Sequence, residues 1–323
     1  MGRASGGADE RKRVFVPTKL EIPEGAEKGR IVWDYIVGIG GIHLLACLAF
    51  VPWVFSWPAV IVAIVGVFFF GQGVNFGYHR LLTHRAAKVP KWLEYTLVII
   101  ALCCLQDTPI KWVTHHRAHH RFSDKRADPH SPFVNFFWGH MGWLFRENRS
   151  IRSAAAFNEY TKELMDIRFY RMLERHMWLW NGVYILHAVL FYLVGFVIGW
   201  AGSGDTATGV QFGLSLLVWG VFVRTVLVWH ITWSVNSFAH RFGYQSHYTR
   251  EGSTNNWLVG MLAAGEGWHN NHHWDEVSAR HGHRWWEFDL TWIIIWTLEK
   301  LGIATEVVRP RQRQPRKKTE AAN

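Results

Sequence analysis

Four long apolar stretches dominate the pattern of hydrophobic and polar positions along the chain. They cover residues 36–55, 58–78, 177–200 and 209–235. Each is close to the roughly 20 apolar residues that an α-helix needs to cross a bilayer. Residues 56 and 57 separate the first pair, and the small and polar residues 201–208 separate the second. The pattern predicts an all-α integral membrane protein with four spanning helices in two hairpins. Four buried helices of a water-soluble protein are the alternative, but such long uncharged stretches are rare there.

Lysine and arginine side chains are concentrated outside these stretches. Residues 1–31 carry 7 of them, residues 79–176 carry 16 and residues 236–323 carry 11, whereas the two hairpin turns carry none. By the positive-inside rule, both termini and the middle segment are expected to face the cytoplasm. Arg224 lies inside the fourth stretch, so it should face protein, water or a partner. The sequence leaves open whether it is a structural anchor or a polar anchor for one end of a substrate.

The two ends of the chain differ in composition from the middle. Residues 1–30 are basic and polar and lack the apolar core of a signal peptide, so we expect a flexible segment there. Residues 31–305 form the predicted membrane domain, and residues 306–323 a basic tail near anionic lipid headgroups. With 35 Lys and Arg against 25 Asp and Glu, the net charge is +10. Basic segments beside anionic lipid headgroups account for this charge, so we expect no nucleic-acid partner. Three cysteines in apolar surroundings exclude a disulfide-stabilised secreted scaffold.

Many of the 19 histidines recur at fixed spacings. The motif H-x-x-H-H occurs twice, the motif H-x-x-x-x-H once, and one further histidine follows the fourth apolar stretch. These nine residues are His79, His84, His116, His119, His120, His240, His269, His272 and His273. Positions i, i+3 and i+4 share one face of a helix, so each H-x-x-H-H can direct three imidazoles to one point. His79 and His84 are i and i+5, and can converge only if the helix ends or unwinds between them.

All nine histidines are predicted to lie on one side of the membrane, close to its surface. Nine imidazoles suit two or more transition-metal ions that prefer nitrogen ligands. The second nitrogen of each ring needs its own partner, and Glu266, Asp124 and Asp128 are near in sequence. Other histidines, such as His43, are expected to be structural.

The motifs that contain these residues resemble the integral-membrane fatty acid desaturases, and closely their Δ9 acyl-lipid and acyl-CoA branch. They are HRLLTHR (79–85), HHRAHH (115–120), RADPHSP (126–132), WSVNSFAHRFG (233–243), GEGWHNNHH (265–273) and SARHGHRWWEFDLTW (278–292). The resemblance covers roughly residues 30–305. It implies four transmembrane helices beneath a cytosolic helical cap that holds two irons above an acyl-chain tunnel.

The resemblance also implies the roles of individual residues. The nine histidines above match the iron ligands, and Asn236 matches a position that holds a metal through water. Asn236 and His240 are four residues apart, which agrees with a shared helix face. Trp112, Thr232 and Trp233 match positions at the bend of the tunnel.

The implied reaction is O2-dependent desaturation, in which a saturated acyl chain gains a cis double bond, expected at Δ9. An unactivated C–H bond calls for a redox metal, which favours two Fe ions over zinc. The substrate is a membrane lipid or an acyl thioester. Thr114 and His115 stand where animal acyl-CoA desaturases have an Arg-Asp pair that contacts coenzyme A, which favours lipid-linked chains.

The electrons are expected from a separate ferredoxin, rubredoxin or cytochrome b5, since no such segment is visible and three cysteines cannot hold an iron–sulfur cluster. Two alternatives stay open at this point. A membrane di-iron hydroxylase of alkane or lipid would use the same histidine motifs. A metal transporter would hold its ion near the middle of the bilayer.

Overall fold

The computed structural model describes residues 18–311, and within them it is all-helical apart from isolated β-bridges. In this part of the chain four helices are long and apolar enough to cross a membrane, which confirms the predicted fold class. The first is α2 (Trp33–Ala46), which continues as the 3₁₀ turn η2 (Cys47–Phe50). The second is α3 (Trp57–Gln72), which continues as the π-helix η4 (Gly73–Thr83). The third is α10 (Met177–Ser203). The fourth runs without a break through α11 (Thr206–Leu217), the π-helix η6 (Val218–Val223) and α12 (Arg224–Ser237).

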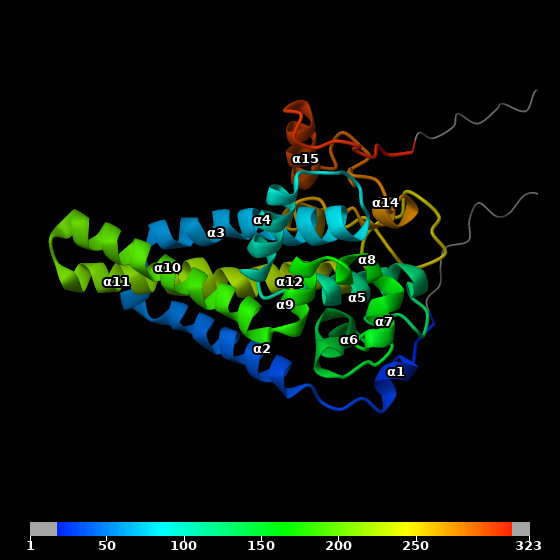
Figure 1. Cartoon of the computed structure of the whole chain (residues 1–323), viewed down its shortest axis with the longest axis horizontal. Helices are drawn as coiled ribbons and strands as arrows, with labels where there is room; N and C mark the ends of the chain where they lie inside the picture. Colours follow the sequence, from blue (N-terminus) through cyan, green and yellow to red (C-terminus); the bar gives the residue numbers. More distant parts are fainter. Residues whose placement is uncertain (1–17, 312–323) are drawn as a thin grey trace, which may run out of the picture.

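The spanning helices form two hairpins whose turns lie together at one end of the molecule, on the left in Figure 1. The first span ends at Phe50, earlier than predicted, because Pro52 begins the separate turn η3 (Pro52–Val54). Ser56 and Asp205 cap the N-termini of α3 and α11 by accepting hydrogen bonds from backbone N–H groups. The two helices of the second hairpin, α10 and α11, pack closely at their glycines. A Cβ added to Gly195 would lie only 2.9 Å from the Cα of Gly213, so a larger residue would not fit there.

Most of the shorter helices gather at the opposite end of the spans and form the cap (Figure 1). Those before the third span are α1 (Glu24–Glu27), α4 (Lys91–Leu102), α5 (Pro109–Phe122), α6 (Phe136–His140), η5 (Gly142–Phe145), α7 (Ala154–Tyr160), α8 (Lys162–Met165) and α9 (Arg168–Arg175). Those after the fourth span are α13 (Trp257–Leu262), α14 (His269–Trp274) and α15 (Leu290–Lys300). The cap is built mainly from two segments that are far apart in sequence, between the second and third spans and after the fourth.

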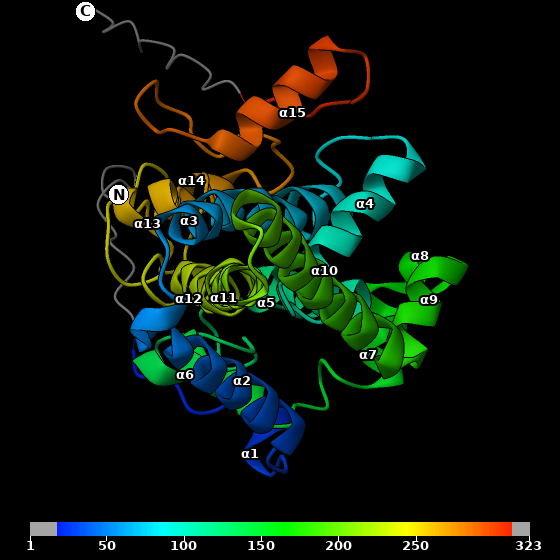
Figure 2. The same ribbon diagram turned by 90° about the vertical axis from the view of Figure 1, so that its left-hand side faces the viewer.

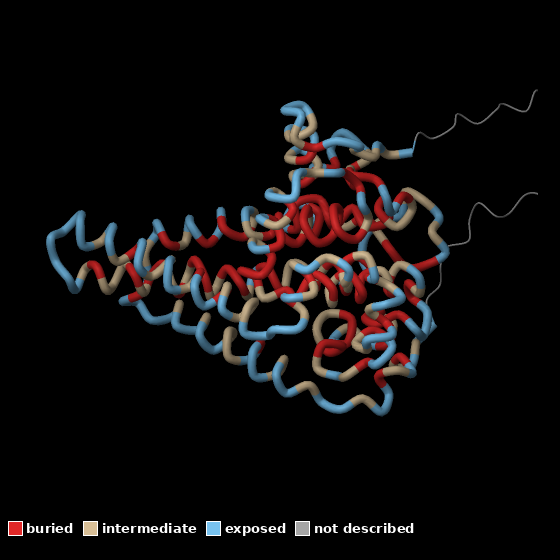
Figure 3. The backbone as a smooth tube through the Cα atoms, viewed as in Figure 1, coloured by how far each residue is buried: buried red, intermediate tan, exposed pale blue. Residues whose placement is uncertain are grey.

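Burial is concentrated where the spans meet the cap, and the outer faces near the hairpin turns are exposed (Figure 3). Only 11% of the most apolar stretch of the first span is buried, and only 17% of that of the third span. Water-soluble proteins rarely expose this much contiguous apolar surface, so we infer that these faces contact lipid. The chain is therefore a membrane protein.

Arg224, the first residue of α12, is fully buried. Its Nη1 donates to the carbonyl oxygen of Cys103 at 2.9 Å, and its Nη2 lies 3.0 Å from Nε2 of His187. Cys103 is the C-cap of α4, so the guanidinium lies at the negative end of that helix dipole. These contacts support a role for Arg224 as a structural anchor, rather than as a polar anchor for one end of a substrate.

The described parts of the two terminal segments pack against the cap. The backbone N–H of Leu20 donates to the carbonyl of Phe133 at 3.0 Å, and Ala26 is fully buried. Near the other end, the N–H of Val308 donates to the carbonyl of Ala86 at 2.8 Å. Residues 18–30 are thus ordered where the sequence predicts flexibility. The rest of that prediction, and most of the predicted basic tail, fall on residues 1–17 and 312–323, outside the described part of the chain.

Candidate metal centre

The end of the second span is a π-helix, and this explains how His79 and His84 come together. In η4 the N–H of His84 donates to the carbonyl of His79, five residues earlier. A π-helix takes more residues per turn than an α-helix, so positions i and i+5 lie nearly above one another. The two ring centroids are 4.8 Å apart. The predicted unwinding between these histidines therefore takes the form of a widened helix.

The other histidines come from α5, α14 and the turn after α12. Thr108 caps α5 by accepting a hydrogen bond from the N–H of Lys111, which fixes the start of the helix that carries the first H-x-x-H-H motif. The second motif makes up most of the short helix α14. His240 lies in the turn that follows α12 and is fully buried.

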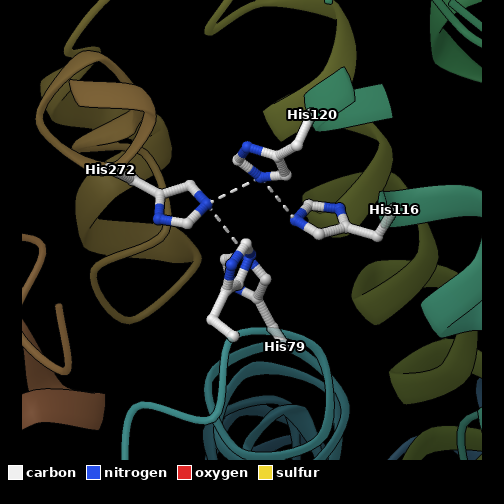
Figure 4. Close-up of side chains that lie close together, drawn as sticks. His79, His116, His120 and His272 are labelled. Atoms are coloured by element: carbon white, nitrogen blue, oxygen red, sulfur yellow. Dashed lines mark hydrogen bonds between the residues drawn. The ribbon is translucent and has the colours of Figure 1, made fainter. Parts of the chain in front are cut away.

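Five of the nine histidines form one group, with ligand nitrogens within 4.8 Å of one another. Its members are His79, His84, His116, His120 and His272. Figure 4 shows four of them pointing toward a common centre. Their Nε2 atoms are 3.1 Å apart between His79 and His272, and 3.0 Å apart between His120 and each of His116 and His272.

The remaining four histidines form a second group beside the first. Its members are His119, His240, His269 and His273. The Nε2 of His269 lies 3.0 Å from the Nε2 atoms of both His240 and His273. Helices α5 and α14 each contribute to both groups, because neighbouring residues within each motif point to different centres. The structure therefore brings all nine predicted histidines into two adjacent groups.

Carboxylates on the outer side orient several of these rings. Glu266 accepts a hydrogen bond from Nδ1 of His79 at 2.6 Å, Asp128 from Nδ1 of His119 at 3.0 Å, and Asp124 from Nδ1 of His240 at 2.9 Å. The three carboxylates expected from the sequence are thus confirmed as partners of these rings. Each ring that donates through Nδ1 turns an Nε2 lone pair toward the centre of its group.

The arrangement fits metal ions. Lone pairs held about 3 Å apart repel one another unless a cation lies between them, and imidazole nitrogen suits divalent transition metals. Among the described residues, the buried Nδ1 atoms of His269 and His272 have no hydrogen-bond partner, so these rings are not held by a protein network alone. Nine nitrogens are enough for two ions.

Burial controls the protonation of these side chains. It lowers the pKa of His116, His119, His269, His272 and His273 well below the usual value, so these rings are neutral and able to bind metal. His240 is the exception. Burial favours its neutral form, but the charge and hydrogen bond of Asp124 outweigh it and raise the pKa of His240 to about 9. A metal ion bound there would displace that proton.

Four further residues near the two groups were not assigned from the sequence. The ring of His281 lies 4.4 Å from that of His272 and its Nδ1 is 3.1 Å from Glu266, while the ring of His130 stacks on that of His119 at 4.4 Å. Glu276 lies 3.4 Å from Nδ1 of His120, and Glu251 lies 3.8 Å from Nδ1 of His273. Both extra histidines lie in motifs already noted, which is the signal that could have found them.

A cavity of about 80 Å³ reaches the histidines from the membrane side. Its walls include His116 and all four of the other predicted site residues, Trp112, Thr232, Trp233 and Asn236. The Trp112 ring stacks on that of His116 with centroids 5.0 Å apart. Gln106 donates through Nε2 to the hydroxyl of Thr232 at 3.3 Å. The cavity next to the group of five therefore has both aromatic and polar residues on its walls.

The sequence profile described as "Fatty acid desaturase" matches residues 30–305. The chain belongs to the fatty acid desaturase family, and it is an enzyme that introduces a double bond into a fatty acyl chain. This agrees with the membrane fold, the histidine groups and the adjoining cavity.

Relatives with different activities are about equally similar to the chain. An sn-1 stearoyl-lipid 9-desaturase of Synechocystis is 42% identical, over 92% of this chain and 87% of the relative. An acyl-CoA 5-desaturase of Anemone leveillei is 43% identical, over 88% and 84%. A palmitoyl-monogalactosyldiacylglycerol delta-7 desaturase of Arabidopsis thaliana is 41% identical, over 89% and 74%. Overall identity therefore does not decide the position of the double bond or the group that carries the acyl chain.

Proposed function

We propose that this chain introduces a cis double bond at Δ9 into a saturated acyl chain of a membrane lipid. The observation that carries the proposal is the cavity whose walls include His116 of the group of five. An acyl chain lying in this cavity would have a methylene pair held beside that group. Several polar side chains on its walls already bond to one another, as Gln106 does to Thr232 and Tyr35 to Asp107.

The proposed ligands of two Fe ions are the nine histidines, with Asn236 acting through a water molecule. The inward Nε2 atoms and the outer carboxylates support this assignment. Bound iron would supply the redox chemistry that uses O2 to remove hydrogen from unactivated methylenes. Overall, two hydrogens leave neighbouring carbons, two electrons and two protons arrive from outside, and O2 is reduced to two molecules of water.

The protein's own part in this reaction is positioning. Trp112 and Trp233 give the cavity rigid aromatic walls, and the hydrogen bond between Gln106 and Thr232 fixes one point on them. A shift of the acyl chain by one carbon would place a different C–C bond beside the metal centre, so the shape of these walls would set the position of the double bond.

The surroundings of Thr114 and His115 support a lipid-linked rather than a CoA-linked substrate. The Thr114 hydroxyl is buried and lies 3.2 Å from that of Thr161, and the buried His115 ring packs against Trp143. Neither residue offers a charge to the phosphates of coenzyme A. The relatives include both lipid-acting and CoA-acting enzymes, so the support comes from these two residues.

The electron donor is proposed to be an acidic one-electron carrier such as ferredoxin, rubredoxin or cytochrome b5. The net charge of +10 would attract it at long range. The positive-inside distribution of Lys and Arg supports a cytoplasmic location for the termini and the histidine groups. A site at one end of the spans (Figure 1) also differs from that of a transporter, whose site lies near the middle of the bilayer.

Expression in a host that lacks its own desaturase tests this function. We expect Δ9-monounsaturated chains to accumulate in membrane lipids, with the double-bond position read by mass spectrometry of derivatised fatty acids. A hydroxylated product without an alkene would favour the hydroxylase alternative and contradict the proposal.

A further inference from the structure

A cleft of about 1000 Å³ opens between the first turns of α2 and α10. Trp33, Asp34 and Gly38 line it on α2, and Met177, Trp180 and Asn181 on α10. These turns are the points where the first and third apolar spans begin on the cap side. The cleft therefore opens at the level of the lipid headgroups, where tryptophan is a common residue.

The cleft adjoins the smaller cavity at the histidines, because the two share part of their walls. Tyr35, Ile39, Leu105, Asp107 and Trp229 line both. An apolar chain that entered between α2 and α10 would thus pass these residues and arrive beside His116.

The first span leaves this route accessible from the side. Seen along the spans, α2 stands at one edge of the bundle (Figure 2), and it packs mainly on η6 and α12. Gly38 lies on the wall of the cleft, and a Cβ placed there would meet no atom within 4 Å. A larger side chain at this position would therefore project into the opening.

The three basic groups at the mouth already have partners. Arg30 lies 3.5 Å from Glu147, Lys111 lies 3.7 Å from Glu174, and the Arg152 guanidinium lies 4.7 Å from the centre of the Tyr35 ring. The lining residues carry three basic groups, Arg30, Lys111 and Arg152, and three acidic groups, Asp34, Asp107 and Glu147. The several phosphate charges of coenzyme A would have to disrupt these pairs, whereas a headgroup without net charge would not.

We propose that the substrate is a glycerolipid whose headgroup has no net charge, and that its acyl chain enters sideways from the bilayer between α2 and α10, through an opening that Gly38 keeps clear. This inference rests on the proposed function, because it names the substrate class and entry route of the same site. The headgroup stays at the membrane surface over the mouth, and the acyl chain alone moves to the histidines.

The test uses the full-chain holoenzyme in phosphatidylcholine vesicles with a distearoyl glycerolipid that carries a diazirine in its acyl chain. Photolysis should label peptides that contain residues 33–39, 105–107 and 177–181. The Gly38→Leu substitution should lower both this labelling and the initial rate by about tenfold or more, with iron content and unfolding temperature unchanged. Gly40→Leu is the matched control, because Gly40 is also exposed and has open space around it but does not line the cleft. The labelling and the initial rate of the Gly40→Leu variant should stay close to those of the wild type.

Headgroup choice is read in the same vesicles with galactosyl, phosphocholine and phosphoglycerol versions of the probe. The galactosyl and phosphocholine probes should label the cleft and be desaturated. The anionic phosphoglycerol probe should show labelling and desaturation that are both at least several-fold lower. Preference for the anionic lipid, or displacement of the probe by stearoyl-CoA, would overturn the headgroup assignment.

Labelling spread evenly over the outer faces of the spans, or equal behaviour of the Gly38→Leu and Gly40→Leu variants, would overturn the entry route. The two proposals fail separately. Labelled cleft peptides without an alkene product would contradict the proposed function alone, and an alkene without cleft labelling would contradict this inference alone.

Discussion

The Oε2 atom of Glu266 lies 2.6 Å from Nδ1 of His79, and the other oxygen of the same carboxylate accepts a hydrogen bond from Arg80 at 3.0 Å. Arg80 is in turn paired with Asp289 at 2.9 Å. Glu266 on the loop before α14 thus fixes the ring of a histidine in the second span. The buried carboxylate joins the membrane part of the site to its cap.

Glu266→Gln should therefore weaken metal binding. The amide keeps the size of the side chain but loses the charge that stabilises His79, and loss of such partners typically lowers metal affinity by about 10- to 100-fold. Glu276→Gln is the comparison, because Glu276 lies farther from its ring, 3.4 Å from Nδ1 of His120, and its side chain is 47% exposed. Iron retained against a competing chelator should fall clearly more in the first variant. Equal retention would contradict this role of Glu266.

One histidine from each group should be indispensable for activity. His119→Ala and His272→Ala should each lower desaturation by at least about 100-fold, since a lost ligand costs more than a lost ligand partner. His283→Ala is the control, because His283 lies in the same cap but in neither group. Activity is measured by product analysis, with iron content and thermal unfolding in detergent followed in parallel. A fully active His119→Ala or His272→Ala variant would show that the ligand assignment is wrong.

The π-helix that aligns His79 with His84 depends on close packing against α4. A Cβ on Gly73 would lie 2.3 Å from the backbone nitrogen of Ala101, whereas a Cβ on Gly71 would meet nothing within 4 Å. Gly73→Ala should destabilise the fold by about 1–3 kcal/mol or more through overpacking. Gly71→Ala should be neutral or slightly stabilising, because alanine is the better helix former.

Thermal unfolding followed by tryptophan fluorescence compares these two glycine variants. The Gly73→Ala variant should also lose iron at a lower temperature than the wild type. Similar unfolding temperatures for the two variants would argue against tight packing between η4 and α4.

The hydrogen bond from Gln106 to Thr232 should affect where the double bond forms. Thr232→Val removes the hydroxyl at nearly constant volume, so part of the product should carry the double bond at a neighbouring position while iron content stays the same. Thr225→Val is the control, since Thr225 is also on α12 and its hydroxyl contacts Tyr184 at 3.2 Å, away from the cavity. Positional isomers are quantified by mass spectrometry. An unchanged isomer ratio in Thr232→Val would exclude this contact as a determinant of position.

The spans and the nine histidines could be predicted because their signals are local. Apolar length alone identifies a spanning helix, and the spacing H-x-x-H-H marks the histidines that gather. The expectation that each motif directs three rings to one point was wrong, because each motif divides its rings between the two groups. The first span was nevertheless predicted at residues 36–55, whereas the helix covers Trp33–Phe50 and ends before the visible stop signal Pro52.

Other features depend on packing between distant segments and could not be predicted in this way. Glu276 and Glu251 approach His120 and His273 only because the cap folds over α5. The H-x-x-x-x-H spacing predicts that the helix ends or unwinds between His79 and His84, but it does not predict a π-helix there. The cleft beside Gly38 exists because two hairpins meet at a particular distance, which no periodicity along the chain encodes.

The most direct test of the account is the metal content of the purified, active protein, measured by inductively coupled plasma mass spectrometry alongside activity. We predict about two iron atoms per chain, with iron and desaturation lost together on chelation and regained together when ferrous ion is restored. Active protein that contains no iron, or that holds zinc in its place, would contradict the claim that the nine histidines form an oxidative metal centre.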